Sequence, residues 1–313
     1  MNLPPGYTSR PANLEDLDDV AALLDTWELA KFGESEAIRS MLQFEWAAAW
    51  LDLGRDTRLI LAPDGELAAF AQHSSPDPAH RFEAFGPVHP GFEDRGLGSA
   101  ILDWTEDRTR ARLGSGSTIR LWNSAPAGDT GATALLEARG YVPIRTFLQM
   151  TIELDASFDA GLAPDGVTIR PFVVGEDGPA AFAVLDSAFA THFGYFQESF
   201  DDWLAQQQSD ETWDPSLGLV AEFEGGIVGL SNNGVIDGTG YIFELAVHPE
   251  RQGRGIGRAL LRRALAMLAA RGIRNGRLGV DTENVTGAFE LYRSVGMETA
   301  REHRVFEKFI EAV

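Results

Sequence analysis

The chain has 313 residues, of which 44% are hydrophobic, and it carries a formal net charge of −21. This length exceeds one ordinary domain and suits two, each able to bury a core. Because acidic residues are spread over both halves, the charge argues against a nucleic-acid partner, whose phosphates would be repelled. It mildly favours cationic, amine-bearing substrates, although a generally acidic proteome explains it equally well.

Features that the sequence lacks disfavour other classes of protein. No window of about eighteen residues is apolar and free of charge, so no transmembrane helix is expected. The N-terminus carries no signal-peptide pattern. The absence of cysteine excludes disulfides and cysteine catalysis, and the six histidines show no metal-ligand spacing. We therefore expect a cytoplasmic protein without membrane, nucleic-acid or metal partners, either a monomer or a homodimer.

An internal repeat organises the chain. Residues 7–11 match 167–171, and the later matches keep nearly the same offset: 59–65 with 219–225, 88–90 with 247–249, and 96–98 with 255–257. Two copies of one unit indicate a tandem duplication rather than a solenoid of many repeats. We predict domains at 1–155 and 165–313, joined by a linker of low periodicity.

The predicted elements follow the same order in both domains. In the first, a strand ends near Arg10, helices cover 14–27 and 35–51, a hairpin turns at 63–65, a glycine turn lies at 96–98 before a helix, a strand covers 118–122, and a short helix ends at Gly140 before a closing strand. In the second, a strand ends near Arg170, helices cover 178–189 and 199–208, a hairpin turns at 224–226, strands cover 241–247 and 277–280, and a short helix ends at Gly296. This order predicts an α/β fold, with a mixed, mostly antiparallel sheet flanked by helices in each domain.

The stretch 244–257 is the most informative part of the second domain. Its strand delivers Glu244, and glycines at 253, 255 and 257 follow just before a helix that ends at Gly272. Glycines at a helix start let backbone N–H groups approach phosphate oxygens, and the helix dipole favours the same anions. The segment therefore predicts a site for a phosphorylated ligand beside a carboxylate. Its glycine spacing does not fit a dinucleotide fingerprint, and a P-loop tripeptide is absent.

Three motifs of the second domain occur together. Glu-Leu-Ala-Val-His-Pro precedes the glycine turn, Gln252-x-x-Gly255-x-Gly257 forms it, and Asn284-x7-Tyr292-x3-Gly296 follows it. Together they resemble the Gcn5-related N-acetyltransferases, the GNAT superfamily, and the resemblance covers nearly the whole chain twice, as in tandem two-domain members. It implies that acetyl-CoA is the acyl donor and that the acceptor is a primary amine of a small molecule or peptide.

The two domains are not chemically equal. Where the second domain has Glu244, Gln252 and Tyr292, the first has Phe85, Glu93 and Leu136. In addition, residues 245–247 are replaced by Gly-Pro-Val, and the proline has no N–H to donate. We therefore expect the second domain to be catalytic and the first to be a degenerate, non-catalytic copy that is structural, regulatory or a passive holder of cofactor.

The resemblance assigns roles to residues of the second domain. It implies that Glu244 is the general base and Tyr292 the general acid, with a salt-bridged strand glutamate and a core tyrosine as the structural alternatives. The backbone of Leu245, Ala246 and Val247 would bind the pantetheine arm as an added strand and donate an N–H to the oxyanion. The other cofactor-binding residues would be Gln252, Gly253, Arg254, Gly255, Ile256, Gly257 and Arg258 at the pyrophosphate, and Asn284, which contacts pantetheine or caps the helix carrying the tyrosine.

Some alternatives remain open. His192 is a second possible base, and the aromatic residues of segment 191–196 either line an acceptor pocket or belong to the core. A non-catalytic acyl-CoA-binding sensor would keep the glycines and lose the base and the acid, which is the pattern of the first domain. A nucleotide-binding regulator is a third possibility, which would be stabilised by NAD or ATP rather than by CoA.

Overall fold

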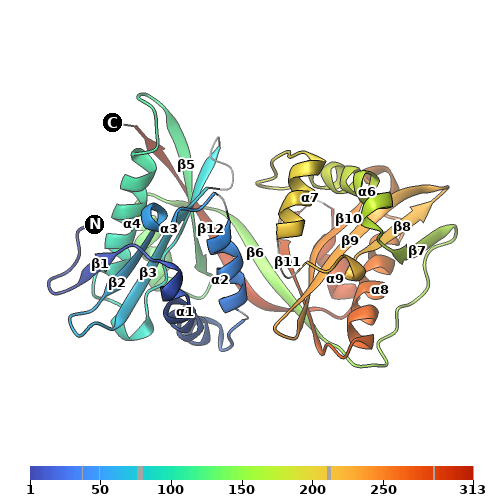
Figure 1. Ribbon diagram of the computed structural model, residues 1–313, viewed down its shortest axis with the longest axis horizontal. Helices are drawn as coiled ribbons and strands as arrows, with labels where there is room; N and C mark the ends of the chain where they lie inside the picture. The colour runs from blue at the N-terminus through green and yellow to red at the C-terminus, as the bar shows by residue number, and fades with distance from the viewer. Residues whose placement is uncertain (37, 49, 76–79, 210–212, 285, 313) are drawn as a thin grey trace. The chain divides into compact units, whose positions relative to one another are not determined.

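The computed structural model describes residues 1–36, 38–48, 50–75, 80–209, 213–284 and 286–312. The chain forms two compact units (Figure 1). The first consists of Met1–Thr146 together with Glu302–Val313, and the second consists of Phe147–Arg301. Each unit is a mixed sheet with helices against it, so the predicted α/β class is confirmed. Among the described residues no helix is long and apolar enough to cross a membrane.

The sheet of the first unit has the strand order β1-β2-β3-β4-β5-β12. The β4 and β5 strands are parallel, and the other pairings are antiparallel. Its elements are β1 (Thr8–Arg10), α1 (Leu17–Phe32), α2 (Ile38–Ala47), α3 (Leu53–Asp56), β2 (Thr57–Leu61), β3 (Leu67–Ser74), β4 (Arg81–Phe85), α4 (Leu97–Arg110), β5 (Thr118–Pro126), α5 (Thr130–Ala138) and β12 (Glu298–Glu311).

The sheet of the second unit has the matching order β6-β11-β10-β9-β8-β7. Here β10 and β11 are parallel, and the other pairings are antiparallel. Its elements are β6 (Val142–Glu153), β7 (Val167–Pro171), α6 (Val174–Phe189), α7 (Phe200–Ser209), β8 (Leu219–Phe223), β9 (Gly226–Ile236), β10 (Thr239–Val247), α8 (Ile256–Ala270), β11 (Asn275–Asp281) and α9 (Ala288–Ser294).

The closing strands are exchanged between the two halves of the sequence. Strand β6 follows the first repeat along the chain but pairs with β11, and its Leu148 and Met150 are buried in the core of the second unit. Strand β12 follows the second repeat but pairs with β5, and its Phe306 and Ile310 are buried in the core of the first unit. The boundaries predicted from the repeat, at 155 and 165, therefore differ from the limits of the compact units.

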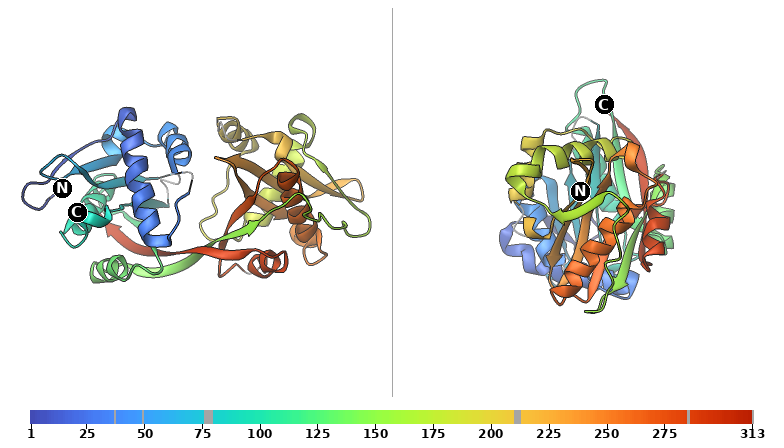
Figure 2. Two further views of the ribbon diagram at one scale, coloured as in Figure 1. Left: turned by 90° about the horizontal axis from the view of Figure 1, so that it is seen from below. Right: turned by 90° about the vertical axis from the view of Figure 1, so that its right-hand side faces the viewer.

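A β-bulge in β10 decides which way the side chains of this strand point. The pairing with β9 shifts register between Ile242 and Glu244, so Phe243 is the extra residue. One extra residue exchanges the two faces of all later side chains. Ile242 packs against α8 and α9, whereas Ala246 packs on the opposite face, in the cluster formed by α6 and α7. The ribbon views show these helices against the sheet of the second unit (Figures 1 and 2). The bulge thus turns Glu244, two residues before Ala246, toward α6 and α7.

Candidate active site

A cavity of about 440 Å³ opens in the second unit where β10 and β11 separate. In the described part of the chain, their parallel pairing consists of Gly240 with Gly276 and Tyr241 with Arg277. Beyond these pairs the strands diverge, and residues of both line the cavity. Of the residues predicted for the site, the lining includes Leu245, Val247, Gln252, Asn284 and Tyr292. Predicted residues from β10, from the glycine turn, and from α9 and the turn before it therefore converge on one cavity.

The proposed base, Glu244, lies beside this cavity rather than in its lining. Its neighbours Phe243 and Leu245 both line the hollow, while its own side chain points toward α7. The amide Nδ2 of Asn232 donates a hydrogen bond to Glu244 Oε2 at 3.1 Å. Burial raises the pKa of Glu244 to about 7, against the opposing effect of the donors on Asn232 and Trp203. A carboxyl group with this pKa can accept and release a proton near neutral pH.

The second proposed catalytic residue, Tyr292, is buried in the wall of the cavity on α9. Burial raises its pKa to about 12, so the phenol stays protonated at neutral pH and is able to donate. Its place is fixed by the end of the helix, where Gly296 is in the left-handed region and Met297 N–H donates to the Tyr292 carbonyl at 3.2 Å.

Asn284 and His192 meet across the cavity. Asn284 Oδ1 accepts hydrogen bonds from the backbone N–H of Thr286 at 2.9 Å and from its hydroxyl at 2.7 Å. Because Gly287 is the N-cap of α9, Asn284 closes the turn before the helix instead of capping it. Its Nδ2 lies 3.4 Å from His192 Nε2. His192, the second possible base, thus faces the cavity, and burial lowers its pKa.

The glycine turn adjoins the cavity at one residue. Gln252 belongs to the lining, and its Nε2 donates to the Val247 carbonyl at 3.1 Å. Gly253 and Gly255 are both in the left-handed region, and α8 begins after Gly255 without a side-chain cap, which leaves its first N–H groups available to an anion. Seven of the predicted cofactor-binding residues do not line the cavity. They are Ala246, which is buried under α6, and Gly253, Arg254, Gly255, Ile256, Gly257 and Arg258.

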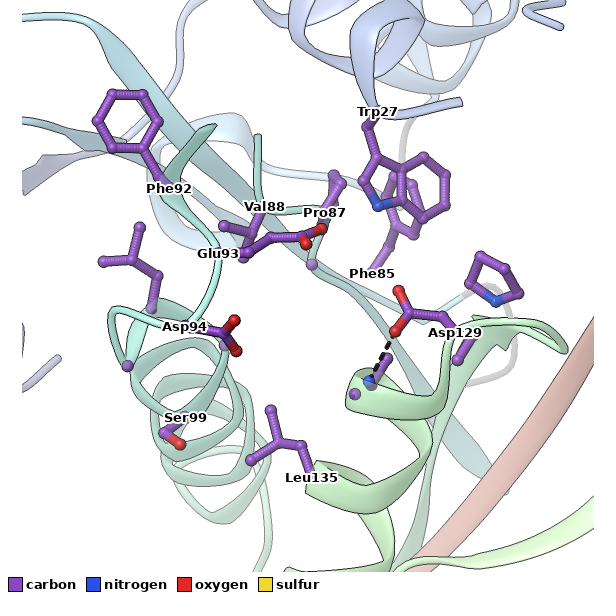
Figure 3. Close-up of a pocket in the computed structure, with 18 of the residues that line it drawn as sticks. Trp27, Phe85, Pro87, Val88, Phe92, Glu93, Asp94, Ser99, Asp129 and Leu135 are labelled. Atoms are coloured by element: carbon purple, nitrogen blue, oxygen red, sulfur yellow. Dashed lines mark hydrogen bonds between the residues drawn. The ribbon is translucent and has the colours of Figure 1, made fainter. Parts of the chain in front are cut away.

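The first unit has a cavity of about 350 Å³ at the equivalent place, between the end of β4, the glycine turn and the start of α5 (Figure 3). Its walls include Trp27 and Phe85, whose rings meet edge to face at 5.8 Å. Three carboxylates, those of Glu93, Asp94 and Asp129, also belong to the lining. Such a lining is unfavourable for a diphosphate, in contrast to the neutral Gln252 of the second unit.

A lysine spans the cleft of the first unit. Lys31 Nζ lies 2.8 Å from Glu93 Oε1 and 2.7 Å from Asp129 Oδ2, so it joins the glycine turn to the start of α5. In the repeat, Lys31 corresponds to His192, since each precedes a Phe-Gly pair. The contact between His192 and Asn284 is the second unit's counterpart of this double ion pair. No role for Lys31 was predicted from the sequence, although in the repeat it occupies the position equivalent to that of the candidate base His192.

Comparison with known proteins gives the same family for both units. The model of the acetyltransferase (GNAT) family matches residues 21–141 and again 183–297. A protein of Kineococcus radiotolerans named mycothiol acetyltransferase is 37% identical over 253 residues, which are 79% of this chain and 80% of the relative. A mycothiol acetyltransferase of Thermobispora bispora is 35% identical over 76% of this chain and 79% of its own length.

Solved structures agree over the whole length of the chain. A GCN5-related N-acetyltransferase from Sphaerobacter thermophilus superposes with a TM-score of 0.88 at 32% identity, covering 100% of this chain and 98% of that one. A tandem GNAT protein from the clavulanic acid biosynthesis pathway shares the fold, with a TM-score of 0.74 at 15% identity and coverage of 98% and 99%. The chain belongs to the acetyltransferase (GNAT) family, as an N-acetyltransferase built from two tandem GNAT units.

Proposed function

We propose that the protein transfers an acetyl group from acetyl-CoA to a primary amine of a small molecule, and that the second unit carries out the reaction. The main support is the cavity between the diverging strands β10 and β11, which has Tyr292 in its wall and Glu244 beside it. The pKa of Glu244 near 7 and that of Tyr292 near 12 suit a base and an acid that act together at neutral pH.

The donor would bind along β10. The part of β10 that has diverged from β11 offers its backbone at Leu245 to Val247 to the pantetheine arm, in the manner of an added strand. The N–H groups at the start of α8, with the glycine turn before it, would hold the diphosphate, and the exposed Arg254 and Arg258 would add charge-assisted contacts.

The transfer itself requires a neutral amine. A primary amine has a pKa near 10 and is almost wholly protonated at pH 7. Glu244 would take this proton through water, because the carboxylate does not line the cavity. The nitrogen lone pair then attacks the thioester carbon, forming the C–N bond and an oxyanion that a β10 N–H stabilises. When the C–S bond breaks, Tyr292 would give its proton to the departing thiolate. The second proton of the attacking nitrogen would leave through water and reprotonate the tyrosine oxygen, which yields the neutral amide and the free thiol.

The acceptor that the relatives favour is of the mycothiol type. The curated relatives described above are named mycothiol acetyltransferases, and the chain covers about four-fifths of their length. We propose as acceptor the cysteinyl amine of the pseudodisaccharide that such enzymes acetylate. A small cationic amine also fits the acidic character of the chain.

We propose that the first unit does not catalyse acetyl transfer. At the places of the base and the acid it has Phe85, which lines the cleft, and Leu136, which is buried in the core. The cleft also presents carboxylates where a diphosphate would lie. The two ion pairs of Lys31 link its walls. A structural role for this unit is consistent with each of these features.

The direct test is an acceptor screen with acetyl-CoA, in which product is detected by mass spectrometry and thiol release is followed in parallel. The panel contains the cysteinyl pseudodisaccharide, simple primary amines and short peptides. We expect N-acetylation of the pseudodisaccharide, with kcat/KM reduced by about 10²-fold or more in Glu244→Gln and in Tyr292→Phe. Glu93→Gln, in the equivalent turn of the first unit, is the matched control and should leave the rate unchanged.

The rival functions predict different results. A non-catalytic acyl-CoA sensor would be stabilised by CoA in a thermal melt but would acetylate no amine in the panel. Full activity in both Glu244→Gln and Tyr292→Phe would remove these residues from the mechanism without removing the enzyme from its family.

A further inference from the structure

Behind the proposed base lies a buried amide that makes two contacts. Asn232 on β9 stands directly opposite Glu244 in the β9–β10 register and is 5% exposed. Its Nδ2 donates to Glu244 Oε2 at 3.1 Å and to Gln207 Oε1 on α7, also at 3.1 Å. Both amide hydrogens are thereby used, one on the carboxylate and one on the helix that covers it.

This arrangement depends on the bulge at Phe243. Before the bulge, Ile242 is paired with Asn233, whose side chain donates to the Leu217 carbonyl at 2.7 Å on the other face of the sheet. After the bulge, Glu244 is paired with Asn232, on the face covered by α6 and α7. The extra residue therefore brings the carboxylate and this particular amide onto the same face as direct cross-strand neighbours.

Trp203 on α7 supplies a second donor close to the carboxylate. The indole is 2% exposed, and within the described residues its Nε1 has no hydrogen-bond partner at bonding distance. It nevertheless lies near enough to Glu244 to favour the ionised form of that carboxyl. Two buried N–H donors and no buried cation thus surround the carboxylate in the described part of the site.

The first unit contains a natural comparison for Asn232. Gln72 on β3 stands opposite Phe85, the counterpart of Glu244, and its Nε2 donates to Glu45 Oε1 on α2 at 2.6 Å. In both units, then, a buried strand amide reaches the helix above it. The second unit differs in that its amide also donates to a carboxylate on the neighbouring strand, Glu244 of β10, at the place where the first unit has Phe85.

We infer that Asn232 is the positioning residue for Glu244: its amide holds the carboxylate beside the cavity and ties it to α7. The inference rests on the proposed function, because it assigns a task to a partner of the proposed base. Asn232 itself lines no part of the cavity and touches no reacting atom.

Other charged groups near Glu244 act in the opposite sense. Glu198, in the segment before α7, faces Glu244 and disfavours its ionisation, and Asp202 on α7 and Asp186 on α6 act similarly on Glu198. A carboxylate that is both buried and repelled needs donors to ionise at neutral pH. Loss of the Asn232 amide should therefore shift the titration of Glu244 to higher pH.

The test is the pH dependence of kcat/KM for the acceptor in Asn232→Leu, measured on the full chain with saturating acetyl-CoA. We expect the acid limb to move up by about one pH unit, which lowers kcat/KM about tenfold near pH 6.5 and much less near pH 8.5. The KM for acetyl-CoA should stay unchanged, because the residue lies off the cavity. Gln72→Leu is the matched control and should leave the acid limb in place.

Two further variants make the outcome decisive. Asn232→Asp keeps the size of the side chain but replaces the donor by a carboxylate, so it should shift the acid limb in the same direction and further. This variant replaces Asn232→Leu in the test if the leucine variant does not fold. A wild-type acid limb in a folded Asn232 variant overturns the inference, provided that Glu244→Gln abolishes activity. Full activity in Glu244→Gln instead means that the proposed base is wrong, and the two failures are thereby told apart.

Discussion

In the second unit, burial acts on the two residues that we propose as base and acid. It raises the pKa of Glu244 to about 7 and that of Tyr292 to about 12. The same physical cause therefore brings the pKa of the carboxyl group close to neutral pH and keeps the phenol protonated. These are the protonation properties that the proposed roles require.

The raised pKa of Glu244 also has a consequence for stability. A carboxyl whose pKa rises on folding from 4.5 to about 7 stabilises the fold while protonated, and this contribution is lost as the pH rises through 7. Glu244→Gln should therefore increase the free energy of unfolding at pH 8 by about 2 kcal/mol, after allowance for the remaining solvent contact. Below pH 4.5 the variant and the wild type should be equally stable.

Urea unfolding at pH 8 and at pH 4 measures this difference. Glu66→Gln, at an exposed position of the hairpin between β2 and β3, is the control and should change the free energy of unfolding little at either pH. A Glu244→Gln variant less stable than the wild type at pH 8 would contradict the expectation that the ionised carboxylate lowers the free energy of unfolding.

The sequence allowed some site residues to be predicted and concealed others. Glu244, Asn284 and Tyr292 were predictable because they lie in motifs with a fixed spacing along the chain. Asn232 and Trp203 were not, because their contacts with Glu244 depend on strand register and on the packing of α7. Local sequence carries no signal for either.

At the scale of elements, the bulge in β10 has the largest effect on the site. Apart from Thr239 and Glu244, the residues of this strand are apolar or aromatic, and nothing in the sequence marks an extra residue. The strand, the glycine turn and the following helix were predicted within a few residues of β10 and α8. The direction of the glutamate was not predicted, because it depends on a register shift that only the pairing with β9 reveals.

Insertion of one alanine between Asn232 and Asn233 of β9 should give Phe243 a partner and so remove the bulge. In the regular ladder that results, Glu244 takes the face of Ile242 and enters the apolar cluster under α8, or the strand beyond it slips by one residue. In either case we expect kcat/KM to fall by about 10²-fold or more, together with a loss of stability from a misplaced buried charge.

Kinetics and thermal melts of the insertion variant provide the measurement. Phe243→Ala is the matched control, since it keeps the bulge while shortening a side chain at the cavity. It should retain far more activity than the insertion variant. Equal activity in the insertion variant and the wild type would show that the bulge does not determine the direction of the proposed base.

At the scale of the whole molecule, the repeat and the compact units divide the chain differently. Repeat matching predicted two tandem GNAT domains, and the family and the fold are confirmed. It did not predict that β6 and β12 would pair with strands of the other half. Matching of sequence copies reveals equivalent strands but does not determine which sheet each one joins.

Fragments of the chain should reflect the compact units rather than the repeat. A fragment of residues 165–313 lacks β6, so it leaves the edge of β11 unpaired and removes Leu148 and Met150 from the core. A fragment of residues 147–301 retains these residues and omits most of β12, which pairs elsewhere. We expect the 147–301 fragment to melt cooperatively and the 165–313 fragment to aggregate or remain partly unfolded.

Circular dichroism melts and gel filtration of the two fragments at equal concentration make this comparison. Adding residues 147–164 back to the 165–313 fragment should restore a cooperative transition. A 165–313 fragment that melts as sharply as the 147–301 fragment would contradict a requirement for β6.

The exchange of closing strands also sets the order in which the molecule can be finished during translation. The second unit has all its residues once Arg301 has been synthesised, whereas the first must wait for Glu302–Val313. At about 5–20 residues per second, residues 127–301, which are more than half of the chain, are synthesised while β5 still lacks β12 as its neighbour. The half that leaves the ribosome first is therefore the one that completes its sheet last, and it is the half that nascent-chain chaperones would meet in an open state.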